Sequence, residues 1–366
     1  MRSSHGQAPV ARQWLASGLA GSEDGRGSRT VKLIETHFAW VLLCDRHAYK
    51  IKKPVSQGSM DYRTLAGRGR GCRAELRLNR RLAPDVYQAV VPVVQTRGGG
   101  LALGRRGRVV EWLVKMRRLP ASGMLDWRLS HGTVAAADLD RVMARLTSFF
   151  DTARPMPLAD RAFVARLAAR AKRTARELRR PEFRLGRQRI DRILRIQLDL
   201  IRRGVLAARG GQVIEGHGDL RPEHIYVGSA QRRACVIDCL EFDLDLRRVD
   251  PVEEMGFLML ECTRMGRPDV ATQLLARYRR HGSDPVADSL VHLYASCSAM
   301  NRAQIAIWHL RDRTLSAPPS HWRGRARSYL ADALAQAQLA RREFRREHPA
   351  PRPSRHRHPP VARRPW

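Results

Sequence analysis

Short apolar runs with alternating polar positions dominate the first third of the chain. Three of them follow one another at residues 31–37, 38–44 and 48–54, and a further run covers residues 109–116. Alternation with a period of two predicts β-strands, and the short polar turns between the first three runs predict an antiparallel meander. Glycines at positions 98–100, 104 and 107 predict a hairpin before the last of these strands.

Beyond residue 121 the apolar positions recur every three or four residues instead. This spacing is typical of amphipathic helices, which pack one face into a core. It predicts helices at about residues 164–178, 190–201, 251–262, 286–308 and 322–344. The pattern therefore predicts an α+β fold, in which a small antiparallel sheet is followed by a larger, mostly helical part.

The length of 366 residues suffices for one two-lobed unit with a sizeable core. We expect an N-terminal extension over residues 1–30, a first lobe over residues 31–119 and a helical lobe over residues 120–347. The remaining residues, 348–366, are rich in Pro, Arg and His, and we expect them to form a disordered basic tail.

The composition is strongly basic, with a formal net charge of +33 and a pI of about 11.4. Such a charge invites a nucleic-acid or anionic-membrane partner, because neutralising phosphates drives non-specific binding. No nucleic-acid-binding module or regular set of aromatic residues accompanies it. We therefore favour solvated, arginine-rich helices, with nucleic acid bound only non-specifically through the basic surface and tail. The oligomeric state stays open.

Cysteines and long apolar runs indicate the compartment. The six cysteines show no Cys-x-x-Cys spacing, which favours core thiols over a zinc site or disulfides. No apolar run approaches the roughly 20 residues of a membrane span, and residues 1–30 lack a signal-peptide core. We expect a cytoplasmic protein without a membrane partner.

Two carboxylates in the middle of the chain each follow a strand-like apolar run. Asp219 lies in a glycine-hinged loop that follows residues 213–215. Asp238 directly follows the apolar residues 234–237 and begins an Asp-x-x-Glu pattern that ends at Glu241. Two acids on adjacent loops suit phosphoryl transfer. One accepts the proton of an attacking hydroxyl, and the other holds the magnesium that neutralises the triphosphate.

The strand at residues 48–54 carries candidate phosphate ligands. Alternation places Lys50 and Lys52 on one face of it. Only six of the 68 basic residues are lysines, and three of these lie at positions 50–53, which favours a role for a compact ammonium group. Glu75, on the helix predicted at residues 72–82, is the candidate partner of one of them, and residues 67–71 are interpreted as a glycine-rich loop before that helix. The alternative is two solvated strand lysines.

The segment His217-Gly218-Asp219, followed by Ile237-Asp238, resembles the aminoglycoside phosphotransferase family, whose members share the protein-kinase-like fold. Residues 34–37, 49–55 and 75–84 look like an uncharacterised bacterial branch of that family, many members of which carry a second, carboxy-terminal P-loop ATPase domain. The chain contains no Gly-x-x-x-x-Gly-Lys-[Ser/Thr], so we expect no such domain here.

The resemblance implies ATP and Mg²⁺ as cofactors, with Mn²⁺ as an alternative metal. It implies that Asp219 is the general base, with His217 beside it, and that Asp238 is a metal ligand helped by Glu241. A phosphate anchor is also implied, and the order Ile51-Lys52 favours Lys52 slightly over Lys50. The family's metal-binding asparagine falls on His224, and imidazole is a poor ligand for Mg²⁺.

Three further residues would contact the nucleotide in a kinase-like fold. The turn between the first two strands contains no glycine, so Thr36 and backbone amides would cover the phosphates. The strand at residues 109–116 would lead into the hinge, where Lys115 and Met116 line the adenine pocket through backbone groups.

The predicted function is an ATP-dependent phosphotransferase acting on a hydroxyl group of a small molecule. The arginine excess between residues 160 and 203 favours an uncharged or acidic acceptor over an aminoglycoside. A cluster of acids favours the opposite: Glu223, Glu241, Asp243, Asp245, Glu253 and Glu254. The alternatives are a catalytically silent nucleotide-binding regulator, indicated by His224 and the glycine-free turn, and a basic nucleic-acid-binding protein.

Overall fold

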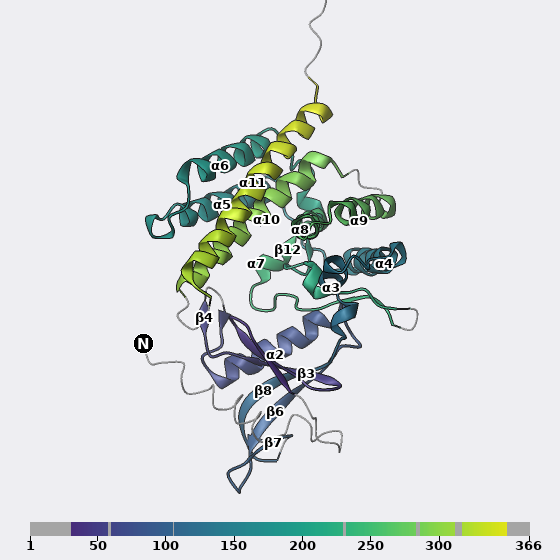
Figure 1. Cartoon of the computed structure of the whole chain (residues 1–366), viewed down its shortest axis with the longest axis vertical. Helices are drawn as coiled ribbons and strands as arrows, with labels where there is room; N and C mark the ends of the chain where they lie inside the picture. The colour runs from purple at the N-terminus through teal and green to yellow at the C-terminus, as the bar shows by residue number, and fades with distance from the viewer. Residues whose placement is uncertain are drawn as a thin grey trace, which may run out of the picture.

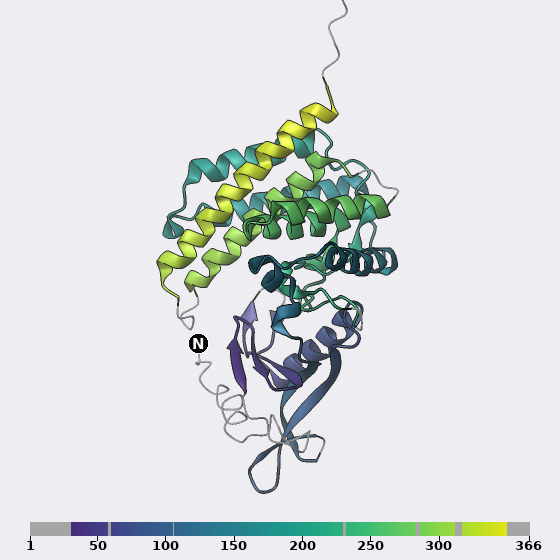
Figure 2. The same cartoon turned by 45° about the vertical axis from the view of Figure 1, so that its right-hand side comes forward.

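The computed structural model describes residues 31–349 except 58–59, 105, 230–231, 283–285 and 312–316. The predictions for residues 1–30, and for all but two residues of the tail, lie outside the described residues. The described chain forms a sheet part and a helical part, one above the other (Figures 1 and 2). The predicted α+β architecture is confirmed, whereas the residue boundaries of the two lobes stay predictions.

The sheet part is a single antiparallel sheet of six strands in the order β1-β2-β3-β8-β6-β7. Its strands are β1 (Lys32–Glu35), β2 (Ala39–Leu43), β3 (His47–Lys52), β6 (Tyr87–Gln95), β7 (Leu101–Leu103) and β8 (Arg108–Arg117). A two-stranded ribbon, β4 (Ser56–Gln57) and β5 (Met60–Asp61), precedes the helix α2 (Leu65–Asn79).

Side chains of β3 alternate between the two faces of this sheet. Tyr49 and Ile51 pack into an apolar cluster on one face together with Leu42 and Leu113. The lysines at positions 50 and 52 point to the other face, toward α2 and the loops of the helical part. The alternation in the sequence therefore delivers both ammonium groups to one side of the sheet.

The prediction of a loop at residues 67–71 is wrong, because this segment forms the first turns of α2. Thr64 caps the helix by accepting a hydrogen bond from the backbone N–H of Gly67 at 3.0 Å. The glycines serve close packing. A Cβ at Gly69 would lie 2.8 Å from the Trp112 indole nitrogen, and one at Gly71 would lie 2.6 Å from the Tyr62 ring. Glycine lowers helix propensity, but here it lets α2 approach the sheet.

The helical part follows, and α8, α10 and α11 build much of its core. In both views α11 runs diagonally across the outer side of this part (Figures 1 and 2). Its helices are α3 (Leu125–Ser130), α4 (Ala136–Thr152), α5 (Asp160–Leu178), α6 (Arg187–Arg202), α8 (Pro251–Arg264), α9 (Pro268–His281), α10 (Asp288–Trp308) and α11 (Pro319–Glu347). Within the described residues, no helix combines the length and apolar character that a membrane crossing requires.

Short strand pairs between α6 and α8 carry the loops that face the sheet. The first pair is antiparallel and joins β9 (Ile214–Glu215) to β12 (Arg248–Val249). The second joins β10 (Ile225–Tyr226) to β11 (Cys235–Val236). Between β11 and β12 lies the one-turn helix α7 (Leu244–Arg247). These pairs hold residues 216–224 and 237–243 side by side.

Candidate active site

The loop after β9 carries Asp219, whose carboxylate lies near Arg221 and His224. Gly218 shapes this loop with a φ of 86°, which side-chain-bearing residues rarely adopt. A Cβ at this position would also lie 2.8 Å from the carbonyl oxygen of Leu246. Although burial opposes ionisation, Arg221, His224 and Arg302 hold the pKa of Asp219 below its usual value. The carboxylate is therefore ionised at neutral pH and can accept a proton.

His217 joins this loop to the loop after β11. Its Nδ1 accepts a hydrogen bond from the backbone N–H of Asp219 at 3.2 Å, so Nε2 carries the proton and donates to the Ile237 carbonyl at 2.9 Å. The side chain is fully buried, and burial together with His224 lowers its pKa to about 4. The imidazole is therefore neutral and braces the two loops.

Glu254, in the first turn of α8, holds the same loop from below. Its Oε1 accepts hydrogen bonds from the backbone N–H groups of His217 at 2.7 Å and Gly218 at 2.6 Å. Burial raises its pKa to about 7, although these two hydrogen bonds favour the charged form. Arg247 adds a second brace, because it donates to Glu215 at 2.9 Å and to the Leu240 carbonyl at 2.8 Å.

Asp238 follows β11 in a left-handed backbone conformation, with a φ of 64°. Its N–H donates to the hydroxyl of Tyr87 at 3.1 Å, which ties this loop to the sheet. Its side chain is about half exposed, at 46%. Lys50 and His224 outweigh the effect of burial and hold the pKa of Asp238 well below its usual range.

The imidazole of His224 lies between the two acids. Its Nδ1 is 3.8 Å from Oδ2 of Asp219, and its Nε2 is 3.7 Å from Oδ2 of Asp238. Nδ1 donates to the backbone carbonyl of Asp219 at 2.8 Å, and Nε2 accepts a hydrogen bond from the Arg221 guanidinium at 3.2 Å. The His224 side chain thus stands where the resemblance places an asparagine.

Lys52 is buried beneath the site in a network of four side chains. Its ammonium group donates to Oε2 of Glu75 at 2.7 Å and to Oε1 of Glu241 at 2.5 Å. Tyr62 donates to the same oxygen of Glu241 at 2.6 Å. Only 2% of the Lys52 side chain is exposed, so its ammonium group is fully engaged inside the protein.

Lys50 lies nearer the surface of the same cluster. Its ammonium group is 2.5 Å from Oδ1 of Asp238 and 2.9 Å from Oε1 of Glu75. Although burial disfavours its charge, these two carboxylates and Glu241 hold the pKa of Lys50 well above its usual value. Glu75 therefore binds one lysine through each carboxylate oxygen, and Lys50 connects it to Asp238.

The donor set suits a metal ion that arrives together with a nucleotide. Magnesium in nucleotide sites takes one or two carboxylates, with phosphate oxygens and water completing its shell. Asp238 offers one exposed carboxylate, with His224 beside it. Glu241 is directed to Lys52 and Tyr62 instead. The described part of the chain contains no group of three or more His, Cys, Asp or Glu side chains that could form a metal cage.

Three further predicted residues lie outside this cluster. The hydroxyl of Thr36 is used within its own turn, where it donates to the Ala39 carbonyl at 2.9 Å and accepts from the Ala39 N–H at 3.0 Å. Lys115 and Met116 lie within β8, where both pair with residues of β3 and β6. Their predicted contacts with a nucleotide stay predictions.

Several residues that shape the site were not anticipated as part of it from the sequence. Asn79 lies within residues 75–84 and Glu254 belongs to the acidic cluster, but the sequence assigns neither a contact with the site. The residues share a dependence on tertiary contacts: Tyr62, Asn79, Tyr87, Arg221, Glu254 and Arg302. Asn79 illustrates this. It accepts a hydrogen bond from the backbone N–H of Cys239 at 2.9 Å and donates to the Glu75 carbonyl at 2.9 Å, and so joins α2 to the loop of Asp238.

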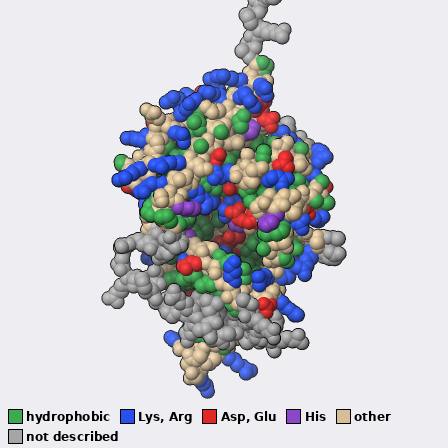
Figure 3. Space-filling view, viewed as in Figure 1, with side chains coloured by type: hydrophobic (Ala, Val, Ile, Leu, Met, Phe, Trp, Pro, Cys, Tyr) green, Lys and Arg blue, Asp and Glu red, His purple; other side chains and the backbone are tan. Residues whose placement is uncertain are grey.

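Acidic side chains gather around the hollow between the sheet part and the helical part (Figure 3). In the cluster of acids predicted from the sequence, each carboxylate has a partner. Ion pairs join Glu223 to Arg221, Glu241 to Lys52, Asp245 to Arg248 and Glu253 to Arg170, whereas Glu254 binds backbone amides and Asp243 caps α7. These acids therefore do not form a surface of unpaired negative charge.

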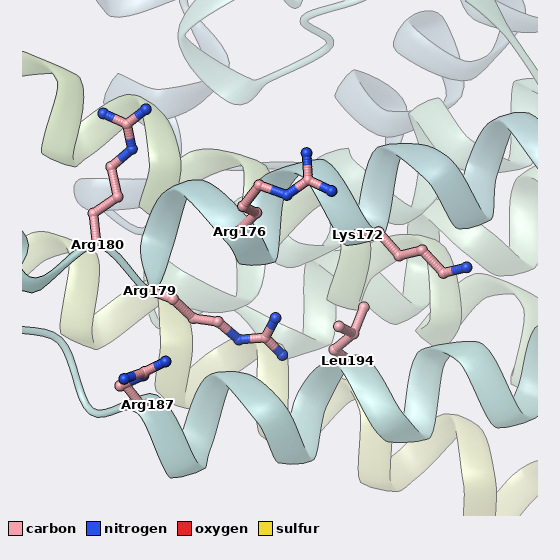
Figure 4. Close-up of a pocket in the computed structure, with 6 residues that line it drawn as sticks. All are labelled: Lys172, Arg176, Arg179, Arg180, Arg187 and Leu194. Atoms are coloured by element: carbon pink, nitrogen blue, oxygen red, sulfur yellow. The ribbon is translucent and has the colours of Figure 1, made fainter.

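A separate cavity of about 460 Å³ lies between α5 and α6, and none of the candidate site residues lines it. Figure 4 shows Arg179 and Leu194 in the space between these helices. Arg179 is paired with Asp191, but three lining residues have no ion pair within the described residues: Lys172, Arg176 and Arg187. The cavity is a basic groove, which we call the α5–α6 groove.

Comparison with known proteins identifies the fold of this chain but does not establish an activity. No family model matches the chain. Uncharacterised proteins of Mycobacterium tuberculosis and Mycobacterium bovis are each 29% identical to it over 277 residues, which are 74% of this chain and 53% of theirs. The chain thus spans about half the length of the curated relatives it matches.

Among solved structures, a choline/ethanolamine kinase family protein from Mesorhizobium loti is similar over 90% of this chain and 99% of its own. Its TM-score is 0.52 and its sequence identity 13%. A thermostable mutant of an aminoglycoside phosphotransferase covers 86% of this chain and 98% of its own, with a TM-score of 0.47 and 11% identity. The first of these likenesses confirms that the fold is protein-kinase-like.

Proposed function

We propose that this chain is an ATP-dependent phosphotransferase that passes the γ-phosphate to a hydroxyl group of a small molecule. One observation carries the proposal: Asp219 and Asp238 flank the imidazole of His224 at 3.8 and 3.7 Å, and Lys50 lies 2.5 Å from Asp238. A proton acceptor, a carboxylate for a metal and a cation for phosphates thus meet in a protein-kinase-like fold. These are the groups that phosphoryl transfer requires.

Asp219 is the proposed general base. Its depressed pKa keeps it ionised, and Gly218, His217 and Glu254 fix its loop so that the carboxylate is oriented before the acceptor arrives. Asp238, with His224 beside it, would hold Mg²⁺ or Mn²⁺. The metal ion would neutralise charge on the phosphates.

Lys50 is the proposed phosphate anchor, although the sequence pattern favours Lys52. The ammonium group of Lys52 is bound by two buried carboxylates, so binding a phosphate there would require breaking that network. Lys50 has 14% of its side chain exposed and contacts Asp238, the carboxylate beside which the metal-bound phosphates would lie. Glu75 then orients both lysines.

We propose an uncharged or acidic acceptor rather than an aminoglycoside. The support is the pairing of the acids around the site, each of which already has a cation or a backbone amide as its partner. A polycation would have to displace these partners. The reaction would take place in the cytoplasm, since the six cysteines are all free and buried.

The test is Mg·ATP hydrolysis and acceptor turnover by Asp219→Asn and the wild-type protein, with nucleotide affinity measured in parallel. Loss of a general base should lower turnover by about 10²- to 10⁴-fold and leave nucleotide binding intact. Turnover that survives the substitution would contradict the assigned base.

A silent nucleotide-binding regulator is the second candidate, and His224 is the observation that favours it. Imidazole in place of an oxygen ligand weakens a magnesium site. This candidate predicts nucleotide binding without turnover of any acceptor, with either Mg²⁺ or Mn²⁺.

A further inference from the structure

Arg302, on α10, approaches the proposed general base from the helical part. One terminal nitrogen of its guanidinium is 4.0 Å from Oδ1 of Asp219. Only 12% of the side chain is exposed, because neighbouring positions on α10 such as Met300 and Ala303 pack into the core. A charged group that is largely buried thus lies at the edge of the site.

The guanidinium of Arg302 makes no hydrogen bond within the described part of the chain, and its Nε is buried without an acceptor. The distance of 4.0 Å to Asp219 is too long for a hydrogen bond. Other buried arginines are satisfied by carboxylates: Arg68 by Glu111 at 2.8 Å, and Arg209 by Asp250 at 2.7 Å. Since buried charged donors without acceptors are costly, Arg302 differs from these structural arginines.

The surroundings of Arg302 neutralise its charge only in part, through Asp219 at 4.0 Å and the nearby Glu261. The ring of Tyr329 lies beneath three guanidinium groups, with Arg264 at 3.7 Å, Arg302 at 5.8 Å and Arg325 at 6.0 Å from its centroid. The nearby Glu261 carboxylate accepts hydrogen bonds from the Tyr329 hydroxyl at 3.0 and 3.2 Å. Burial raises the pKa of Glu261 although the charge of Arg302 opposes the rise, so this carboxyl is a weakened counter-charge and makes no hydrogen bond to Arg302.

We propose that Arg302 binds an anionic group of the acceptor, a carboxylate or a phosphate, next to the hydroxyl group from which Asp219 takes the proton. A guanidinium suits this role because its fork of N–H donors matches planar oxyanions. This inference rests on the proposed function, and it narrows the acceptor to a small hydroxyl compound that carries a negative charge.

The position of Arg302 favours the acceptor over the γ-phosphate of the nucleotide. Its guanidinium contacts Asp219, whereas Lys50 contacts Asp238 on the other side of the His224 imidazole. Arg221 cannot take the same role, since its terminal nitrogens already bind Asp219, at 3.0 Å, and Glu223. Arg302 and Lys50 therefore serve different ends of the site.

The first experiment compares wild type, Arg302→Gln, Arg302→Lys and the control Arg325→Gln. The control removes an equal charge from the same tyrosine ring, but at an exposed side chain. The acceptors are four three-carbon compounds that differ in one terminal group: glycerol, glycerate, glycerol 3-phosphate and 3-amino-1,2-propanediol. Turnover and KM are measured for each acceptor, and KM for ATP is measured alongside.

Wild type should prefer glycerate or glycerol 3-phosphate, and the preferred one identifies the anionic group. Arg302→Gln should raise KM for the charged acceptors by about 10- to 100-fold, the loss of a hydrogen-bonded charge pair, with KM for glycerol and ATP unchanged. Arg302→Lys should recover part of this loss, and Arg325→Gln should resemble wild type. Equal losses for glycerol and glycerate, or a raised KM for ATP, would overturn the proposal.

A second measurement separates this inference from the proposed function. Binding of inorganic phosphate and of glycerate to each protein is measured by calorimetry without nucleotide. Binding that Arg302→Gln abolishes and Arg325→Gln retains supports the subsite even if no acceptor is turned over, in which case the proposed activity fails alone. Binding that is equal in all variants, or absent from wild type, rejects the subsite.

Discussion

The ammonium nitrogen of Lys50 lies 2.5 Å from Oδ1 of Asp238, and so joins a strand of the sheet to a loop of the helical part. The neighbouring lysine on the same face, Lys52, is instead enclosed by Glu75 and Glu241. One strand thus supplies a cation at the edge of the site and a cation inside it. The two should respond differently to the same substitution.

We expect Lys50→Met to weaken ATP binding by about tenfold or more, because a charge-assisted contact to phosphate is lost. Lys52→Met should instead lower the free energy of unfolding by about 3–5 kcal/mol, since it leaves two buried carboxylates without their cation. Lys53→Met is the control, because Lys53 pairs with Glu35 away from the cluster. Calorimetric titration and urea unfolding measure the two effects. Equal small changes in all three variants would restore the view of solvated strand lysines.

We expect Asp238→Asn to keep the fold and to lose the metal-dependent part of nucleotide binding. Asparagine tolerates a φ of 64° and lacks the carboxylate charge. Asp238→Ala should lose the same binding and in addition about 1–2 kcal/mol of stability, because alanine is strained in this conformation. Nucleotide titrations with and without Mg²⁺, together with thermal unfolding, distinguish the two. A variant that binds Mg·ATP as wild type does would remove Asp238 from the metal site.

We expect His224→Asn to shift the metal preference from Mn²⁺ toward Mg²⁺. The imidazole Nε2 faces Asp238 at 3.7 Å, and an amide oxygen suits magnesium better than imidazole does. The measurement is the ratio of turnover with Mn²⁺ to turnover with Mg²⁺ in both proteins. An unchanged ratio would indicate that His224 does not meet the metal. Thermal unfolding of both shows what the lost hydrogen bond to Asp219 costs.

We expect the stability contributed by Glu254 to fall as pH rises from about 4.5 to about 7. Its pKa is raised from 4.5 to about 7 in the folded protein, so in this window the unfolded chain releases a proton that the folded protein keeps. The slope is about 1.4 kcal/mol per pH unit, or about 3 kcal/mol in total.

Glu254→Gln keeps an oxygen for the two backbone N–H groups and removes this titration. The unfolding free energy of wild type minus that of the variant should therefore decrease across the window, as measured by urea unfolding between pH 4.5 and pH 8. His217, whose pKa of about 4 gives an opposite slope, is present in both proteins and cancels in the difference. A difference independent of pH would contradict a raised pKa at Glu254.

We expect any non-specific binding of nucleic acid to depend on the α5–α6 groove. Replacing Lys172, Arg176 and Arg187 together by alanine should weaken duplex DNA binding and lower its salt dependence, because each phosphate contact contributes a slope of about 0.9. The matched control replaces three other exposed arginines of α6, at positions 189, 192 and 195. Equal weakening by both triple variants would mean that total charge, rather than the groove, drives binding.

Local patterns were sufficient to predict β1, β2, β3 and β8, five of the long helices and the charged residues of the central cluster, but they gave no residue ranges for β6, α4 or α9. Alternation along β3 predicts that Lys50 and Lys52 share a face, because the period of a strand is a local property. The prediction of a loop at residues 67–71 was wrong for a physical reason. Glycine-rich composition is typical of loops, but these glycines lie in α2, where Gly69 and Gly71 leave room for the side chains of Trp112 and Tyr62.

Residues that act through tertiary contacts could not be predicted. Arg302 is one of 62 arginines and lies 83 positions after Asp219, so nothing in its neighbourhood marks it. Glu254 was recognised only as part of an acidic cluster, because its two hydrogen bonds to the loop of Asp219 depend on how α8 packs beneath β9. The partners of such residues can be identified only once the fold is known.

The packing of α2 limits how this protein can be switched. Gly69 lies against Trp112, Gly71 lies against Tyr62, and Arg68 is bound to Glu111 of β8 by two hydrogen bonds in the interior. A helix held to its sheet along this face is not free to swing outward and carry Glu75 away from the lysines. Displacement of α2 away from the sheet is thus disfavoured. Any relative motion of the two parts would have to move the sheet and α2 together, as one rigid body, against the helical part.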